Sequence, residues 1–307
     1  MIAELKYQNL IKKNIIYFNN FPNGRLANAA FEFLYAKYLE KLGFKVIIGA
    51  PNHPPEVDIF WKLFDLPNNN HYFSVEHSIF LGEERAFGPE ISIQKIKEHF
   101  KNYPGSILCI DGYFQFDTNK ILEDSDYFMT FETNLGLNFE PTNTFQKIIG
   151  TYKKKIESNY LVTIHVRRGD YLYFVKSGDW REKVFYVLNL DNVLEKLQKY
   201  ITSNRIKNLV VYIASDDIDF CKNYFTSKNI KILTSEDFIE RRVDNPLMVD
   251  LAAMTAANML IASNSSLSIL GAMINNRGKV FWREDIHGEL TSFDPWSTPI
   301  LYGPLPC

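Results

Sequence analysis

Residues 161–170 read LVTIHVRRGD, a run of alternating positions that ends in two arginines, a glycine and an aspartate. The period-two alternation predicts a buried β-strand with the two valines and the isoleucine on one face and Thr163, His165 and Arg167 on the other. Open α/β sheets bind ligands at the carboxyl ends of their strands, and the planar guanidinium of Arg167 can donate two charge-assisted hydrogen bonds to a diphosphate. The alternative, an ion pair between Arg167 and Asp170 across a turn, stays open on the sequence alone.

Apolar strands alternate with helical segments on both sides of this strand. In the second half we expect strands at residues 160–166, 209–214, 231–233, 259–262 and 279–282, and helices at 190–200, 218–225, 246–257 and 267–274. In the first half we expect strands at 15–18, 46–48 and 106–110 and helices at 26–42 and near 145–157, while residues 51–103 show no sustained period. Such alternation is typical of parallel sheets flanked by helices. We therefore predict an α/β fold, doubly wound in the second half.

The length of the chain predicts two domains. At 307 residues it exceeds the usual size of a single hydrophobic core. We expect an N-terminal α/β domain over residues 1–140 and a C-terminal Rossmann-like domain over 141–307 that ends in a tail.

Composition limits the classes of function. The formal net charge of −2 gives no general attraction for polyanions, so nucleic acid is not an expected partner. Three scattered cysteines without a C-x-x-C pair predict neither a disulfide framework nor a zinc site and favour a reducing, cytoplasmic compartment. Residues 1–10 have no long apolar run, so we expect no signal peptide or anchor there. A removed membrane stem, peripheral association with the inner face of a membrane and the oligomeric state stay open.

The loop Ser263-Asn264-Ser265-Ser266 lies between a predicted strand and a predicted helix. Free N–H groups and the positive end of a helix dipole favour phosphate at such a place. Serine and asparagine are also good helix N-caps, and on the sequence alone this simpler interpretation is preferred.

A carboxylate lies among apolar residues in the next candidate segment. Asn245 and Pro246 open a predicted helix whose inward stripe is Leu247, Leu251, Met254 and Asn258, and Asp250 lies on that stripe. A buried carboxylate needs a partner, such as a guanidinium, backbone amides or the N–H groups of a ligand. A satisfied structural aspartate is the common explanation of such a position.

Two further patterns are less specific. Gly24-Arg25-Leu26-Ala27-Asn28 follows the first strand, where glycine allows close approach to a ligand. Asp124-Ser125-Asp126 and Asp217-Ile218-Asp219 are D-x-D sequences, which arise by chance in a chain of this length. Dinucleotide, P-loop, G-x-S-x-G and H-E-x-x-H motifs do not occur, which lowers the dehydrogenase, kinase, hydrolase and metalloprotease interpretations.

The order of these segments resembles one family. The matching segments are GRLAN at 24–28, GYFQ at 112–115, HVRRGD at 165–170, SDD at 215–217 and the region 250–266. Together they resemble the α1,2-fucosyltransferases of glycosyltransferase family 11, from about residue 15 to about residue 282. The H-x-R-R-G-D hexad is the most specific element, and similar motifs recur in α1,6- and protein O-fucosyltransferases. The resemblance implies a GT-B-like architecture of two Rossmann-like domains facing a cleft, with the acceptor on the N-terminal side and the GDP-sugar on the C-terminal side.

The resemblance also implies roles for single residues. It implies that Arg167 binds the donor pyrophosphate, that His165 and Asp250 contact the guanosine, that Ser265 and Ser266 lie by the phosphates, and that Gly24, Arg25 and Asn28 lie beside the donor. The chain departs from the family at two places: residues 27–31 read ANAAF where members commonly read GNQMF, and Ile269-Leu270 stands where paired tryptophan is common.

The function that the resemblance implies is an inverting transfer of L-fucose from GDP-fucose to a glycan hydroxyl, α1,2 to galactose, without a metal ion or other cofactor. Arg167 would stabilise the departing GDP, Asp170 and Asp179 are candidate bases, and Asn28 could only orient the acceptor hydroxyl because an amide is no base. Two alternatives stay open: transfer from another activated deoxysugar, of the rhamnose or perosamine type, and a non-catalytic module that binds nucleotide-sugar or glycan.

Overall fold

The computed structural model describes residues 14–18, 26–48, 79–80, 93–110, 150, 154, 159–238, 246–275, 280–285 and 287–295. The chain divides into two compact units, residues 1–140 and 141–307. Each unit is described by itself below.

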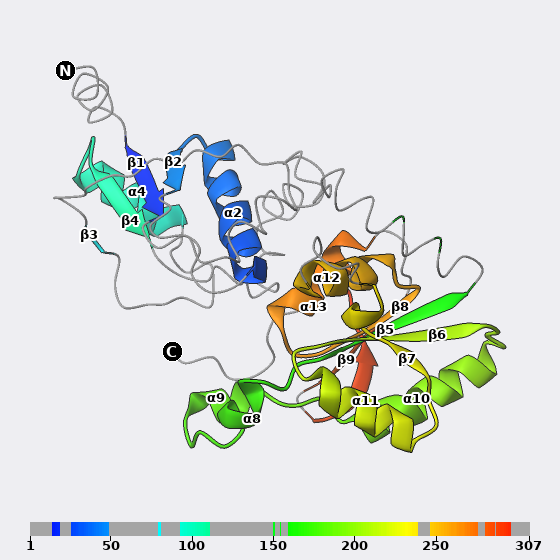
Figure 1. Cartoon of the computed structure of the whole chain (residues 1–307). Helices are drawn as coiled ribbons and strands as arrows, with labels where there is room; N and C mark the ends of the chain where they lie inside the picture. The colour runs from blue at the N-terminus through cyan, green and yellow to red at the C-terminus, as the bar shows by residue number, and fades with distance from the viewer. Residues whose placement is uncertain are drawn as a thin grey trace. The chain divides into compact units, whose positions relative to one another are not determined.

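The N-terminal unit contains a four-stranded parallel sheet in the order β2-β1-β4-β3 (Figure 1). Its strands are β1 (Ile15–Phe18), β2 (Lys45–Ile48), β3 (Ile79–Phe80) and β4 (Ile107–Ile110). Helix α2 (Leu26–Lys41) connects β1 to β2. The turn that follows it contains Gly43, whose φ of +90° is open to glycine but strained for other residues. Buried side chains of β1, β2 and β4 form the core of this sheet.

One helix of this unit was not expected from the sequence. Helix α4 (Ile93–Asn102) lies within the stretch in which no period is apparent. Among its described side chains, from Lys95 to Asn102, Ile96, His99 and Phe100 are buried, at the spacing of one helix face. A helix this short has too few turns for its period to stand out among the surrounding aromatic and polar residues.

The C-terminal unit contains a six-stranded sheet in the order β10-β9-β8-β5-β6-β7. The strands are β5 (Tyr160–Val166), β6 (Leu209–Ser215), β7 (Ile232–Leu233), β8 (Met259–Ala262), β9 (Val280–Glu284) and β10 (Leu290–Ser292). Strand β5 pairs in parallel with β6 on one side and β8 on the other. The carboxyl ends of these three strands therefore meet at one edge of the sheet.

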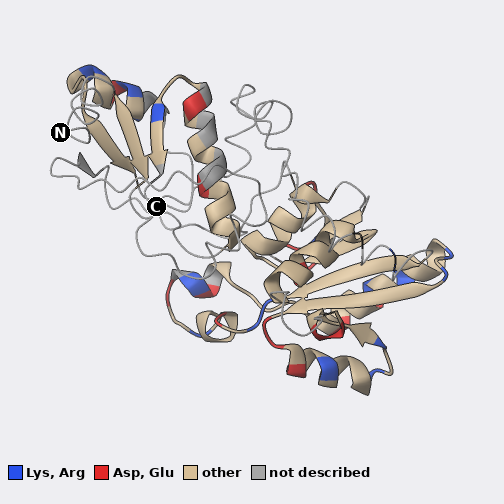
Figure 2. Cartoon of the chain, turned by 45° about the horizontal axis from the view of Figure 1, so that its top comes forward, with Lys and Arg blue, Asp and Glu red and all other residues tan. Residues whose placement is uncertain are grey.

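Helices cover both faces of this sheet (Figure 1). On one face α10 (Leu190–Ser203) and α11 (Ile218–Ser227) pack on the valines and isoleucines of β5, as the alternation predicted. On the other face lie α12 (Pro246–Ala256) and α13 (Ser266–Ile274), and the Thr163 hydroxyl donates to the carbonyl oxygen of Ala253 at 3.0 Å. The outer helices α10 and α11 carry charges of both signs, whereas α12 and α13 have a single charged residue, Asp250 (Figure 2). The polar face of β5 is thus covered by the least polar pair of helices.

The predicted strands of this unit, β5 to β9, pair in parallel as expected, and the unpredicted strand β10 adds an antiparallel edge beside β9. One prediction about this unit is wrong. Helix α12 has no inward stripe: every residue from Met248 to Ala256 is buried, since η2 (Ser235–Asp237), α13 and the sheet all pack on it. The helix predicted near 145–157 falls largely outside the described residues.

Between β5 and α10 the chain forms two short helices, α8 (Tyr171–Phe174) and α9 (Trp180–Val184). Rings of Tyr171, Phe174 and Phe185 lie 4.9 to 6.2 Å apart and form the core of this segment. Among the described residues, no helix combines the length and apolar character needed to cross a membrane.

Candidate functional site

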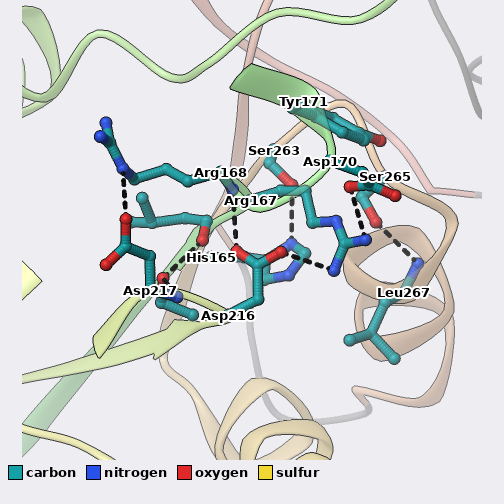
Figure 3. A network of polar contacts seen from close by, with 12 residues as sticks. His165, Arg167, Arg168, Asp170, Tyr171, Asp216, Asp217, Ser263, Ser265 and Leu267 are labelled. Atoms are coloured by element: carbon teal, nitrogen blue, oxygen red, sulfur yellow. Dashed lines mark hydrogen bonds and ion pairs between the residues drawn. The ribbon is translucent and has the colours of Figure 1, made fainter. Parts of the chain in front are cut away.

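The site begins where β5 ends, at Arg167 (Figure 3). Its Nη2 lies 2.7 Å from Asp170 Oδ1, and its Nη1 lies 2.7 Å from Asp216 Oδ2. The guanidinium carbon lies 5.6 Å from the centre of the Tyr171 ring. The side chain is 15% exposed, so both donor edges of the guanidinium are held in a largely buried place by two carboxylates. The ion pair with Asp170 that the sequence left open is therefore formed, together with a second one.

Arg168 extends to the opposite side (Figure 3). Its Nε lies 3.1 Å from Asp217 Oδ2, and its guanidinium carbon lies 3.4 Å from the centre of the Phe220 ring. Asp217 in turn caps α11 by accepting from the backbone N–H of Phe220 at 3.2 Å. Although β5 ends at Val166, the two arginines diverge as a strand would direct them, and Arg168 braces α11 rather than joining Arg167.

Asp216 connects the ends of β5 and β6. Its Oδ2 pairs with Arg167, and its Oδ1 accepts from the backbone N–H of Arg168 at 2.8 Å. Gly169 lies against the same carboxylate: a Cβ atom there would stand 2.5 Å from Asp216 Oδ2. A side chain at position 169 would therefore push the Asp216 carboxylate away from its place beside Arg167.

His165 and Tyr171 tie the β5 end to the β8–α13 loop. His165 is 4% exposed, and its Nδ1 lies 2.7 Å from the hydroxyl of Ser263. Burial, and then the charge of Arg167, lower the pKa of His165 to about 3, so the ring is neutral near pH 7. The Tyr171 hydroxyl donates to the carbonyl oxygen of Asn264 at 2.6 Å.

The residues of the β8–α13 loop differ in their surroundings. Ser263 and Asn264 are fully buried, and both form hydrogen bonds within the protein. Ser263 bonds to His165, and Asn264 donates to the carbonyl oxygen of Val184 and accepts from Arg283. The Ser265 hydroxyl caps α13 by accepting from the N–H of Leu267 at 3.4 Å, and Ser266 is half-buried at the first position of the helix. The N-cap interpretation therefore holds for Ser265, and the hydrogen bond from Tyr171 to Asn264 places the start of α13 next to Tyr171.

Asp250 has a partner that the sequence did not indicate. It is 8% exposed, and its Oδ1 accepts a hydrogen bond from the hydroxyl of Tyr212 on β6 at 2.6 Å. Burial raises the pKa of Asp250 to about 7, against the opposing effect of the Tyr212 hydrogen bond, with a further upward contribution from the charge of Asp216.

The two candidate bases are in different states. Asp179 caps α9 and is bound through both oxygens by Arg181, at 2.6 to 3.1 Å. Hydrogen bonds from Arg181 and Ser177 hold the pKa of Asp179 far below its usual range, which makes it a poor proton acceptor. Asp170 is also paired with an arginine, but with Arg167 of the candidate diphosphate site, through Oδ1 at 2.7 Å.

The predicted N-terminal residues are described only in part. Gly24 and Arg25 lie outside the described residues. Asn28 is a half-buried residue in the first turn of α2, in the other unit from Arg167.

The described part of the chain contains no group of three or more metal-ligating side chains arranged to hold a metal ion. Asp217 of the second D-x-D is engaged by Arg168 and by α11, and the first D-x-D lies outside the described residues.

Three side chains of this site were not assigned a contact from the sequence. Asp216 was visible only as part of the Ser-Asp-Asp segment, and Tyr171 and Tyr212 were not singled out. The sequence did contain a signal for Tyr212. Side chains alternate between the two faces of β6, so Tyr212 lies on the face opposite Val211 and Ile213. That face is covered by α12, whose only carboxylate is Asp250.

Comparison with solved structures defines the class of fold. The fucosyltransferase NodZ from Bradyrhizobium matches with a TM-score of 0.54 and 12% sequence identity, over 92% of this chain and 99% of NodZ. POFUT1 in complex with GDP matches with a TM-score of 0.51 and 12% identity, over 88% of this chain and 97% of POFUT1. Both have the GT-B architecture, so the predicted α/β, GT-B-like fold is confirmed.

Comparison of sequences defines the family. The model of glycosyl transferase family 11 matches residues 122–283, just over half of the chain and including the whole β5 site. The chain belongs to glycosyltransferase family 11, as its motifs predicted. An α-1,2-colitosyltransferase from Escherichia coli is 33% identical over 144 residues, which are 44% of this chain and 44% of that protein.

Proposed function

We propose that the chain is an inverting glycosyltransferase that moves L-fucose from GDP-fucose to a glycan hydroxyl without a metal ion. The observation that carries the proposal is the geometry of Arg167: a largely buried guanidinium at the carboxyl end of β5 holds one carboxylate oxygen at each of its two terminal nitrogens, and the oxygens of a diphosphate could take such positions. Membership of family 11 and the fold shared with NodZ and POFUT1 support it.

The chemistry follows from these contacts. Two phosphate oxygens of the donor would take the place of a carboxylate on Arg167, with the N-terminus of α13 beside them. As the bond to the sugar breaks, negative charge grows on the departing diphosphate, and a guanidinium already in place stabilises it without reorganisation. The in-line acceptor hydroxyl loses its proton to Asp170, which the diphosphate frees from Arg167, while Asp179 stays occupied by Arg181.

A second donor is supported by a specific observation. The curated relative is named for colitosyl transfer, and the region that it shares with this chain covers 44% of each protein. We therefore place colitose beside fucose as the candidate sugar, and the α1,2 linkage to galactose is part of the same proposal. The sequence departures at residues 27–31 and 269–270 fall outside the Arg167 contacts and leave either sugar compatible with the diphosphate site.

The test is donor turnover. The purified chain would be incubated with GDP-fucose, GDP-colitose and GDP-rhamnose, with and without galactose-terminated acceptors, and free GDP and sugar products would be measured. An Arg167→Ala variant serves as the control for contaminating activity. We expect GDP release with one deoxysugar donor, faster with acceptor present. GDP binding without release from any donor would replace the proposal with a non-catalytic binding module.

A further inference from the structure

The strongest feature outside the diphosphate site is the buried pair between Tyr212 and Asp250. Tyr212 is completely buried on β6, and Asp250 is 8% exposed on α12, which packs across β5 and β6. The Tyr212 hydroxyl donates to Asp250 Oδ1 at 2.6 Å. Among the described residues, Asp250 Oδ2 has no hydrogen-bond partner. One oxygen is thus fixed by the protein, and the other remains to accept from a ligand.

We infer that Tyr212 is a positioning residue for nucleotide recognition: its hydroxyl holds the Asp250 carboxylate as an acceptor for the adjacent N–H groups of a guanine base. This inference rests on the proposed GDP-sugar donor. A guanine presents the N1–H and the exocyclic amino group side by side, and only an ionised carboxylate has acceptor capacity toward both. A protonated carboxyl group turns one of these acceptors into a donor.

The surroundings of Asp250 make the tyrosine hydroxyl decisive. Burial, and to a smaller extent the nearby charge of Asp216, raise the pKa of Asp250 to about 7, while the Tyr212 hydrogen bond is the cause that lowers it. His165 on β5 is neutral near pH 7, and α13 has no charged residue. On η2, Glu236 pairs with Lys222, and Asp237 accepts from the N–H of Thr234. Among the described groups of these elements, the Tyr212 hydroxyl is the one that donates to the carboxylate.

The inference predicts a pH dependence of base selectivity. Inosine diphosphate lacks the exocyclic amino group of GDP and is otherwise the same, so the ratio of the two dissociation constants reports the second hydrogen bond alone. In the unmodified protein this ratio should favour GDP about tenfold above pH 7 and approach one below it, since one hydrogen bond to a charged group corresponds to about a tenfold effect.

The experiment measures both affinities by calorimetry between about pH 5.5 and about pH 8.5, on the full chain. In Tyr212→Phe the carboxylate loses its donor, so the midpoint of the selectivity change should move to a higher pH. A matched control is Tyr224→Phe on α11, which removes a hydroxyl that also bonds to an aspartate, Asp191 on α10 at 2.8 Å, on the face of the sheet that α12 does not cover. Its midpoint should stay unchanged.

A second variant covers the case in which Tyr212→Phe does not fold. Incorporation of 3-fluorotyrosine at position 212 keeps the shape of the side chain and makes the hydroxyl a stronger donor, so the midpoint should move down instead of up. A uniform loss of affinity for both nucleotides at every pH, with an unchanged midpoint, would make Tyr212 purely structural and overturn the inference. Absence of any GDP preference in the unmodified protein would instead refute the proposed donor.

Discussion

Replacement of Arg167 by lysine separates the binding role of this side chain from its role in the transfer step. The guanidinium makes two charged contacts at 2.7 Å, one from each terminal nitrogen, in a place that is 15% exposed. A lysine ammonium keeps the charge but cannot span both positions. We expect GDP affinity to fall about tenfold, the effect of one hydrogen bond to a charged group, and turnover with the productive donor to fall about a hundredfold or more, because charge develops on the diphosphate only during transfer.

Arg168→Lys is the matched control, since it changes the adjacent residue in the same way. Arg168 bonds to Asp217 and lies over the Phe220 ring, so its loss should lower the melting temperature through a cation–π and ion-pair loss of about 1 kcal/mol. Turnover should stay within a few-fold of normal. Both variants would be assayed by GDP release after circular dichroism has verified folding. A less active Arg168 variant, or near-normal turnover in both, would show that the diphosphate is held elsewhere.

The remaining predictions concern Asp250, two glycines and metal ions. Asp250→Asn should weaken GDP binding at pH 8 by about 1.5 to 3 kcal/mol, measured by calorimetry. Because the pKa of Asp250 is raised in the folded state, the protonated carboxyl group stabilises the fold fully below about pH 4, and this stabilisation is lost as the pH rises through about 7. The uncharged asparagine of the variant undergoes no such loss. The difference in melting temperature between the variant and the unmodified protein should therefore shift in favour of the variant from pH 5.5 to pH 8. Gly169→Ala should displace the Asp216 carboxylate and lower turnover at least about tenfold, with little loss of stability. Gly271→Ala should instead destabilise the fold by about 1 to 3 kcal/mol, because the added Cβ atom would stand 2.8 Å from Met254 Cβ. Turnover should persist in EDTA, because a guanidinium supplies the charge at the leaving group.

Each of these predictions has a contrary outcome. Unchanged GDP affinity in Asp250→Asn, with a melting temperature lowered equally at both pH values, would make Asp250 structural. Normal turnover in Gly169→Ala would mean that Asp216 does not hold Arg167 in its working position. The neutral control is Gly150→Ala, where an added Cβ atom would meet no described atom within 4 Å. Complete loss of turnover in EDTA, restored by manganese, would refute the metal-free mechanism.

Much of the C-terminal sheet could be predicted because its strands are apolar and bounded by breakers. Strand β5 was predicted at its observed bounds. The alternation of its side chains assigned Arg167 to the same face as Thr163 and His165, at the carboxyl end of the strand. The partners of Arg167 could be predicted only in part. Asp170 is three residues away and was considered, whereas Asp216 comes from β6 and reaches Arg167 only through the parallel pairing of the two strands.

The errors have physical causes of the same kind. The stripe assigned to α12 failed because α13, η2 and the sheet together bury every residue from Met248 to Ala256. Hydrophobic periodicity identifies only a helix that keeps one face in solvent. Strand β10 was missed because three residues, one of them exposed, are too few to show alternation. Tyr212 was overlooked because a tyrosine in an apolar strand looks like core until the carboxylate opposite its hydroxyl is known.

The short edge strands of the C-terminal sheet, β10 among them, affect how readily two copies of the chain could pair through their sheets. Unpaired backbone at the edge of a sheet is a template for another chain, and proteins limit this hazard with short edge strands. Both edges of the six-stranded sheet are short, three residues in β10 and two in β7, while the seven-residue strands β5 and β6 lie inside. Any second copy of this chain that pairs by strand addition would find few free backbone groups, so the sheet that carries Arg167 and Tyr212 is protected from the aggregation that long open edges invite.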